Sequence, residues 1–287
     1  MYLSLTARPS SIVPIRSAPR MLDVAHEDRP LPEATPANPG SKPLADPVAE
    51  AARVLDAAHA EGLTLRLVGG VAIAFLTSGT RLLPRDYKDV DFITSGRDGR
   101  EVRALLTSLG YDSSTAFNGL HGHRRLLYFD PANDRKVDVF VGEFAMCHSW
   151  AIRDRLRVTE KTLPPADLLL TKLQIRALTE KDQRDALSLV YHCEVADRDE
   201  SAVVNAAYVA RLCARDWGLW RTCTLNIERI LGCTSEYDLR PEQRSLVTMR
   251  LTDLHERIER APKSTSWKMR ARVGERIKWY DEPEEVG

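Results

Sequence analysis

The chain has 287 residues, of which 43 % are hydrophobic and 29 % are charged, and its 41 Lys and Arg balance its 41 Asp and Glu. This composition is typical of a globular protein with one large or two moderate domains. A net charge of zero excludes a global attraction to nucleic acid or anionic lipid, so any such attraction must be local. The sequence has no apolar run of about 18 residues, which predicts that no membrane is involved.

Residues 1–44 are rich in proline, in stretches such as "RPLPEATPANPGSKP", and are predicted to form a disordered arm. The five cysteines are odd in number and include no CxxC pair. This pattern argues against a disulfide scaffold or a zinc site and favours a reducing, cytoplasmic setting.

Residues 45–160 alternate between helical and strand patterns. Asp46, Pro47 and Gly62 suit the start and the end of a first helix. After it we expect elements in this order: a strand at 63–70, a helix at 71–79, a strand at 89–96, a helix at 99–110, strands at 124–131 and 135–142, and a last short strand at 153–160. The loop "DPANDR" indicates a hairpin between the strands at 124–131 and 135–142. The pattern predicts an α/β domain with a mixed sheet flanked by helices.

Residues 161–262 have long helical periodicity and are predicted to form an all-helical second domain. We expect its helices in five segments: 164–179, 180–193, 200–216, 217–232 and 240–261. Residues 263–287 are basic at first and acidic at the end, and we expect them to form a tail. A solvated tail is the ordinary interpretation, and contact of its basic part with a phosphate backbone is the alternative.

Three carboxylates lie in strand contexts. Asp89 and Asp91 in "KDVDFI" alternate with apolar residues and therefore share one face, and Asp138 in "RKVDVFVG" is flanked by two valines. If the two strands are adjacent, the three carboxylates converge. Like charges that are buried together repel, so the arrangement indicates a cation between them. Carboxylate oxygens suit Mg²⁺, and a wet strand face is the alternative.

A glycine pair complements the acids. Gly69 and Gly70 follow a strand and precede a helix, so a ligand can approach the backbone closely and the first N–H groups of the helix can receive a phosphate. A phosphate at a helix start beside cation-binding carboxylates suits attack on a nucleoside triphosphate (NTP).

The strand, "VGG", helix, "KDVDF" and the later "KVDVF" resemble the nucleotidyltransferases of the DNA polymerase β superfamily over roughly residues 63–141. The resemblance implies that Gly69 and Gly70 contact the triphosphate. It also implies that Asp89 and Asp91 bind two Mg²⁺ ions, and that Asp138 binds the catalytic ion and helps to deprotonate the acceptor hydroxyl.

The spacer of 18 residues between Gly70 and Asp89 resembles the branch that contains the lincosamide nucleotidyltransferases and the abortive-infection type IV toxins (AbiEii-like). Lys172, Arg176 and Asp185 resemble a downstream motif of those toxins. The motif implies that the two basic residues bind nucleotide phosphates and that Asp185 orients Lys172. We expect Lys172 and Arg176, four residues apart, to share a helix face, and an ordinary exposed helix face is the alternative.

The sequence therefore predicts a magnesium-dependent nucleotidyltransferase that moves a nucleoside monophosphate (NMP) from an NTP to a hydroxyl and releases pyrophosphate. The acceptor stays open between the 3′ end of a tRNA, a protein side chain and a small molecule such as an antibiotic. The toxin-like resemblance favours RNA or protein, and it leaves open whether a cognate antitoxin exists as a partner. The alternative is a non-catalytic nucleotide-binding or partner-binding protein that retains the fold.

Three further segments allow two interpretations each. The basic residues of "RLLPRDYK" (81–88) suit either a nucleotide phosphate or a solvated loop. The two histidines of "HGHRR" (121–125) are better explained as part of a polar loop than as metal ligands. The two tryptophans of "WGLWR" (217–221) are better explained as core residues than as base-stacking residues.

Overall fold

The computed structural model describes residues 42–78 and 82–282. Most of the predicted N-terminal arm (1–44) and the predicted loop residue Arg81 lie outside the described residues. The described chain is of the mixed α/β class, and its residues belong to one compact unit.

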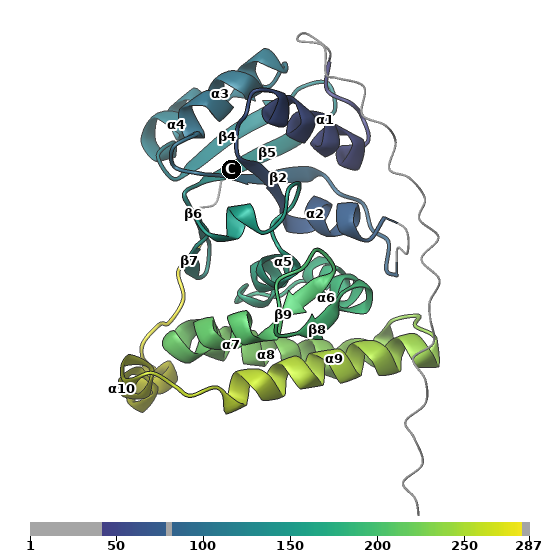
Figure 1. The fold of residues 1–287 in the computed structure, drawn as a ribbon, viewed down its shortest axis with the longest axis vertical. Helices are drawn as coiled ribbons and strands as arrows, with labels where there is room; N and C mark the ends of the chain where they lie inside the picture. Colours follow the sequence, from purple (N-terminus) through teal and green to yellow (C-terminus); the bar gives the residue numbers. More distant parts are fainter. Residues whose placement is uncertain (1–41, 79–81, 283–287) are drawn as a thin grey trace, which may run out of the picture. The chain divides into compact units, whose positions relative to one another are not determined.

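A five-stranded mixed sheet lies in the first part of the described chain (Figure 1). Its spatial order is β1-β2-β5-β4-β3. The strands are β1 (Leu65–Val68), β2 (Asp89–Thr94), β3 (Asp112–Ser113), β4 (Arg125–Asp130) and β5 (Arg135–Val141). The β2–β5 pair is parallel and the other pairs are antiparallel. The predicted hairpin is the β4–β5 pair, and the short strand β3 was not expected.

The alternation of residues along β2 and β5 separates a wholly apolar face from a face that carries the acids together with the buried Ile93 and Phe140. Val90, Phe92, Val137 and Val139 are each at most 1 % exposed and form part of the core. The helices α1 (Pro47–Ala60) and α3 (Gly99–Ser108) lie on one side of the sheet, and the helices after residue 164 lie on the other side (Figure 1). Because residues alternate between the faces, Asp91 and Asp138 point away from that apolar set.

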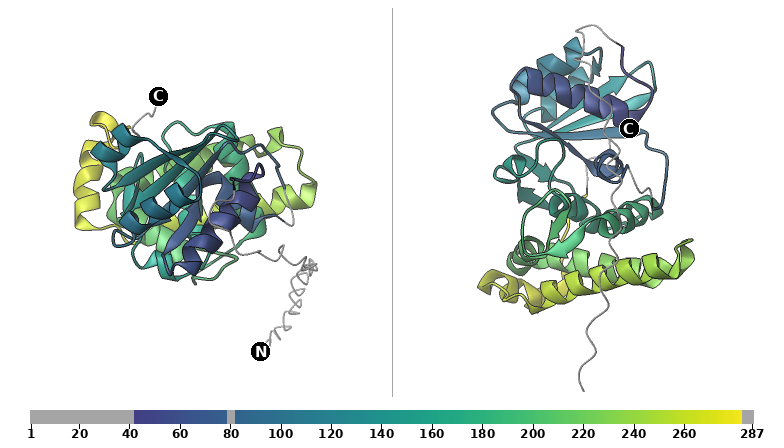
Figure 2. Two further views of the ribbon diagram at one scale, coloured as in Figure 1. Left: turned by 90° about the horizontal axis from the view of Figure 1, so that it is seen from above. Right: turned by 45° about the vertical axis from the view of Figure 1, so that its right-hand side comes forward.

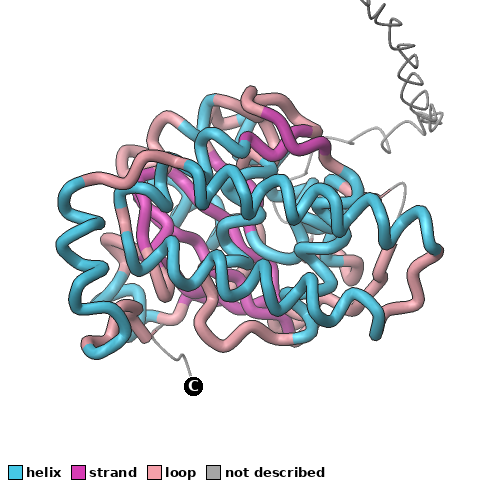
Figure 3. The backbone as a smooth tube through the Cα atoms, turned by 90° about the horizontal axis from the view of Figure 1, so that it is seen from below, coloured by secondary structure: helices cyan, strands magenta, loops and turns pink. Residues whose placement is uncertain are grey.

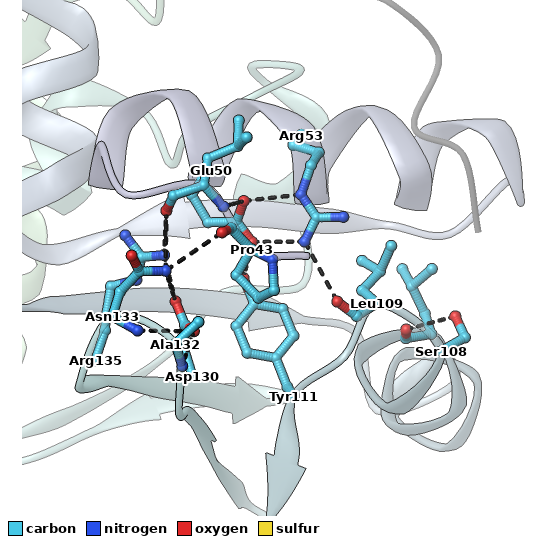
Figure 4. Close-up of polar contacts among 12 residues, drawn as sticks. Pro43, Glu50, Arg53, Ser108, Leu109, Tyr111, Asp130, Ala132, Asn133 and Arg135 are labelled. Atoms are coloured by element: carbon cyan, nitrogen blue, oxygen red, sulfur yellow. Dashed lines mark hydrogen bonds and ion pairs between the residues drawn. The ribbon is translucent and has the colours of Figure 1, made fainter. Parts of the chain in front are cut away.

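Buried polar contacts hold α1 against the sheet (Figure 4). The Glu50 carboxylate is fully buried and accepts hydrogen bonds from the Arg53 guanidinium and the Tyr111 hydroxyl. Nearby, Arg135 donates to Asp130 at 2.6 Å and to the carbonyl oxygen of Leu44 at 2.7 Å. Every charged group in this cluster has a partner, as burial requires.

Two further helices belong to the first part of the chain and lie near the sheet, namely α2 (Gly69–Leu76) and α4 (Thr115–His121). The second part of the chain is mostly helical. A short hairpin of β6 (Glu143–Ala145) and β7 (Ser149–Ala151) leads into the second part. Its helices are α5 (Pro165–Leu173), α6 (Glu180–His192), α7 (Ala206–Arg215), α8 (Trp217–Cys233), α9 (Pro241–Arg260) and α10 (Thr265–Val273). Figure 3 shows several of them lying side by side when the molecule is seen from below.

Two details of this part differ from the prediction. It is not all-helical, because the strands β8 (Glu194–Ala196) and β9 (Val203–Asn205) form a parallel pair. The segment at 153–160 contains a 3₁₀ turn, Arg155–Arg157, and no strand. There the Arg155 side chain is buried against Asp167 and Asp199, and these contacts fix a turn instead of an extended strand.

The edge of β1 joins the sheet to α5. Leu67 donates its backbone N–H to the Lys161 carbonyl at 2.8 Å, and Leu163 donates to the Leu67 carbonyl at 3.0 Å. The segment therefore satisfies the free edge of β1 and starts α5 two residues later, at Pro165. Figure 2 shows α5 next to the sheet in a second view.

The helix α5 ends at Leu173, so the prediction that Lys172 and Arg176 share a helix face is wrong. The Asn226 side chain of α8 donates to the carbonyl oxygens of Leu173 at 2.9 Å and Ile175 at 2.7 Å. These bonds replace the contacts that a longer helix would supply to the same carbonyls. A residue distant in sequence thus determines where α5 ends.

Replacing Asn226 by Ala is expected to lower the free energy of unfolding by about 1–3 kcal/mol, because two carbonyls at the end of α5 lose their donor. Urea denaturation of the variant and the wild type measures this difference. A loss below about 0.5 kcal/mol would contradict the capping role of Asn226.

The expected tail contains α10 and continues through Glu282 in the described residues. Trp279 donates to the Thr222 hydroxyl at 3.1 Å, and the backbone N–H of Asp281 donates to the Cys147 carbonyl at 3.0 Å. Residues 279–281 therefore pack on the preceding helices. Within the described ranges, no helix is long and apolar enough to cross a bilayer.

Candidate active site

Asp91 and Asp138 are direct neighbours in the sheet. They are register partners on the parallel strands β2 and β5. Neighbouring strands are about 4.8 Å apart, and register partners on them direct their side chains to the same face. The adjacency on which the sequence prediction depended is therefore present for these two acids.

Gly69 brings the backbone into contact with the Asp91 carboxylate. A Cβ atom added at Gly69 would lie 2.2 Å from Asp91 Oδ2, and Gly69 has a φ of +73°. Only glycine combines this left-handed conformation with so close an approach. Gly69, the first residue of α2, thus packs directly against Asp91, and a side chain at position 69 would collide with the Asp91 carboxylate.

Burial and charge both act on Asp91. Burial raises the pKa of its carboxyl group and the neighbouring charge of Asp138 acts in the same direction, so that the pKa is about 7. Lys172 and Lys136 act in the opposite direction. A cation beside this carboxylate would relieve the repulsion and favour the ionised form.

Two cationic side chains contact Asp138. The Arg125 Nε donates to one carboxylate oxygen at 2.8 Å, and the Lys136 Nζ lies 3.2 Å from the other. Asp138 itself is only 3 % exposed. Asp89 pairs in register with Lys136 and is exposed at the start of β2.

The glycine Gly70 lies against a second group of charges. A Cβ atom at Gly70 would lie 2.1 Å from Arg85 Nη2 and 3.1 Å from Asp185 Oδ2. Arg85 and Asp185 form a bidentate pair at 2.8 and 2.7 Å. The glycine pair therefore lies between the Asp91 carboxylate and the Arg85–Asp185 pair.

Lys172 extends this charged group. Its Nζ lies 2.9 Å from Asp185 Oδ2 and 3.1 Å from Asp182 Oδ1. Burial alone would lower the pKa of Lys172, but Asp185 and Asp182 outweigh burial and raise the pKa. Burial would raise the pKa of Asp185, yet Arg85 and Lys172 lower it. Asp185 thus contacts both Arg85 and Lys172.

Arg176 lies elsewhere. It follows the end of α5, and its guanidinium carbon is 5.5 Å from the Trp279 ring centroid and 5.7 Å from that of Tyr280. The structure thus brings Arg176 to the C-terminal segment and does not place it beside Lys172 on one helix face.

The donor set of the site fits a divalent cation. Asp91 and Asp138 supply hard oxygen ligands on one face, Asp89 adds a carboxylate at the open end of the same face, and oxygen ligands are what Mg²⁺ prefers. The Asp91 carboxylate lies directly against the backbone of Gly69, where a Cβ atom would have no room. Over residues 42–78 and 82–282, however, no three His, Cys, Asp or Glu side chains are already gathered as a metal-binding group.

Sequence reasoning left the roles of several site residues unassigned or did not identify them. Arg85 was undecided between phosphate binding and a solvated loop, and it is bound to Asp185 and stacked 4.0 Å from the Tyr87 ring centroid. Arg125, Lys136 and Asp182 were not identified. Side-chain alternation puts Lys136 on the same face of β5 as Asp138. It puts Arg125 of β4 on that face too, but only once the register of β4 against β5 is known.

The other singled-out residues lie in ordinary surroundings. His121 ends α4, with its ring centroid 4.8 Å from that of Phe117. Trp217 is 6 % exposed and Trp220 packs against the core, with 6.0 Å between their ring centroids. The interpretation of both tryptophans as packing residues agrees with these contacts.

A comparison of the chain with protein-family models found no match, and a comparison with curated proteins found none either. The residue pattern and the geometry described above are therefore the basis for the function proposed next.

Proposed function

We propose that the protein is a magnesium-dependent nucleotidyltransferase of the DNA polymerase β type, which transfers an NMP from an NTP to a hydroxyl acceptor. The observation that carries the proposal is the in-register pair of Asp91 and Asp138, with the backbone of Gly69 against the Asp91 carboxylate. Two carboxylates that repel each other beside a glycine-containing helix start are suited to bind a cation and a polyphosphate together.

The start of α2 is the proposed phosphate-binding element. Its first residues are Gly69 and Gly70, and no side chain caps the helix start. Backbone N–H groups there are therefore available to phosphate oxygens, and the helix dipole favours negative charge at this end. Lys172 and Arg85 add fixed positive charge beside Gly70, although Asp182 and Asp185 balance it.

Asp89, Asp91 and Asp138 are the residues that would hold the metal. Two Mg²⁺ ions, when bound, neutralise the phosphate oxygens and stabilise the attacking and the leaving oxygen. Lys172 stays in place through its contacts with Asp182 and Asp185, so its charge requires no reorganisation during the reaction.

The transfer exchanges a phosphoanhydride bond of the NTP for a phosphoester bond to the acceptor. The acceptor oxygen bonds to the α-phosphorus, and the bond from that phosphorus to the oxygen bridging the β-phosphate breaks. Pyrophosphate leaves with the electron pair of the broken bond. Asp138 helps to take the hydroxyl proton, once Arg125 and Lys136 have released its oxygens.

One observation favours the second candidate, a non-catalytic protein that retains the fold. Both oxygens of Asp138 are already held by cationic side chains, and such pairing can replace a metal permanently. In that case Asp91 and Asp138 would be structural acids, and neither magnesium nor an NTP would bind between them.

The test is transfer of label from α-labelled NTPs, supplied one at a time with Mg²⁺ and with RNA, protein or small-molecule hydroxyl acceptors. We expect one acceptor class to gain label, and the double variant Asp89→Ala, Asp91→Ala to reduce transfer to background. Asp112→Ala is the matched control, because Asp112 is exposed on β3 of the same sheet. Equal transfer by the double variant, or none by the wild type, would contradict the proposal.

A further inference from the structure

A pocket of about 640 Å³ lies at the end of β2 that is remote from Asp89. Four segments line it: Gly62 and Thr64 before β1, residues 95–98 after β2, Gly142 after β5, and residues 153–157 after β7. Leu156 is the one large apolar side chain in this lining. The pocket is therefore mostly polar, and its walls come from the C-terminal end of the parallel strand pair, from the segment before β1 and from the turn that follows β7.

Three arginines give this pocket its charge. Arg97, Arg153 and Arg157 are exposed and line it together with a single acid, Asp98. Within the described residues, no hydrogen bond or ion pair holds any of the three guanidinium groups, whereas the Asp98 carboxylate accepts the backbone N–H of Thr64 at 3.1 Å. We call the cavity that Arg97, Arg153 and Arg157 line the arginine pocket.

The helix α3 adds to the positive potential. It begins at Gly99 beside the pocket, and the Asp98 side chain makes no capping hydrogen bond to it. Its first N–H groups and its dipole therefore favour an anion at this position. The arginines and the start of α3 therefore both favour the binding of an anion in this pocket.

A second basic pocket, of about 650 Å³, offers a contrast. Arg211, Arg215, Arg257 and Arg260 line it. There Arg257 pairs with Asp197 at 2.8 Å and with Asp253 at 2.9 Å, and Arg260 pairs with Glu256. Acids within the protein thus neutralise much of this second site, while the arginine pocket keeps its charge for a ligand.

The arginine pocket and the proposed active site lie along the same strands. Ser95 is four residues beyond Asp91, which corresponds to about 13 Å of strand. By alternation, Ser95 lies on the same side of the sheet as Asp91 and Asp138. Ile93 and Phe140 lie between the pocket and the acids, and both are buried in the core, with the Phe140 ring centroid 4.8 Å from that of Phe144. A ligand that reaches from the pocket to the carboxylates must therefore pass around these packed residues.

We propose that the arginine pocket binds backbone phosphates of an RNA acceptor whose terminal hydroxyl reaches the Asp91–Asp138 site. This inference rests on the proposed function, since it identifies the acceptor class. Guanidinium groups bind phosphate oxygens in a bidentate manner, which suits three unpaired arginines. A protein acceptor fits less well, because protein interfaces centre on buried apolar and aromatic anchors, and this pocket has one leucine.

Binding of a 5′-fluorescein-labelled single-stranded RNA with a free 3′ hydroxyl, followed by fluorescence anisotropy, tests the inference. The measurement is made in EDTA without NTP, so it requires no transfer. We expect the triple variant Arg97→Ala, Arg153→Ala, Arg157→Ala to raise Kd at least tenfold. The slope of log K against log salt should also fall by about 2, since each phosphate contact on a single strand contributes about 0.7.

The matched control is Arg211→Ala, Arg215→Ala, Arg260→Ala, which removes the same charge around the second basic pocket. It is expected to leave Kd within about twofold, since non-specific attraction alone would respond equally to both sets. Thermal unfolding checks that both variants fold. Equal losses in the two triple variants, or no RNA binding by the wild type, would overturn the inference.

Competition separates the two sources of phosphate. Unlabelled RNA is expected to displace the probe, and an NTP at the same phosphate concentration is not. Displacement by the NTP alone would assign the pocket to the triphosphate and overturn the inference. Arginine-dependent RNA binding without label transfer would refute the proposed nucleotidyltransferase function and support RNA binding by the pocket. Transfer to a small molecule without RNA binding would support the nucleotidyltransferase function and refute RNA binding by the pocket.

Discussion

Replacing Asp91 by Asn is expected to stabilise the protein at pH 8 in the absence of magnesium, by about 1–3 kcal/mol, and to abolish transfer. The pKa of Asp91 is raised in the folded protein from 3.8 to about 7. A carboxyl group whose folded pKa exceeds its unfolded pKa destabilises the folded state once the pH exceeds the unfolded value. One pKa unit corresponds to about 1.4 kcal/mol, so the full pKa shift sets an upper bound on the stabilisation by the variant. Water and local relaxation bring the expected stabilisation below that bound.

The sign of this effect fixes its pH dependence. Below pH 3.8 the wild-type carboxyl is neutral in both states, and the two proteins should differ little. The advantage of the variant should grow between pH 3.8 and about 7 and stay constant above that range. Urea denaturation at pH 5 and at pH 8, with and without magnesium, measures it.

Magnesium should reverse the order of stability. A cation bound between Asp91 and Asp138 stabilises only the folded wild type, because binding to one state shifts the equilibrium toward it. Asp89→Asn is the matched control, since Asp89 is exposed at the start of the same strand. In EDTA, where its proposed role as a magnesium ligand does not apply, it should change the free energy of unfolding by less than about 0.5 kcal/mol. A wild type more stable than Asp91→Asn in EDTA at pH 8 would contradict the repulsion between the two acids.

Replacing Gly69 by Ala is expected to cost about 2–4 kcal/mol of stability and to lower transfer at least about 100-fold. The left-handed backbone at Gly69 costs any other residue about 1–2 kcal/mol. In addition, the new Cβ would lie 2.2 Å from Asp91 Oδ2, so the carboxylate must move. A displacement of about 1 Å in a catalytic group is enough for a loss of this size in rate.

Gly110→Ala separates the two causes. Gly110 has a φ of +91°, also in the left-handed range, but an added Cβ there would make only an ordinary contact, 3.7 Å from Pro43 Cδ. This control should lose only the backbone part, about 1–2 kcal/mol, and keep full transfer. Equal losses of stability and activity in the two variants would show that the contact between Gly69 and Asp91 does not matter.

Local patterns were sufficient to predict the strands that carry the acids. Alternation over "DVDFI" and "RKVDVFVG" gives β2 and β5, and the turn residues between β4 and β5 give their hairpin. The same alternation placed Asp89 and Asp91 on one face. These features depend on residues within one element, so the sequence can specify them.

The pairing of β2 with β5 could not be read from the sequence, because alternation does not determine which strands are adjacent or in which register. The end of α5 was mistaken for a similar reason. Asn226 caps the Leu173 carbonyl from 53 residues away, and helical periodicity alone continued the helix to Arg176. Arg85 and Asp185 likewise meet across 100 residues.

The most direct test of the account compares two positions of label in the NTP. A nucleotidyltransferase moves the α-phosphate, so we expect an acceptor to gain label from an α-labelled NTP and none from a γ-labelled NTP. The γ label should appear in pyrophosphate in equal amount, and Asp91→Asn should remove both signals. Acceptor labelling from the γ position, or no labelling from the α position with the wild type, would contradict the account.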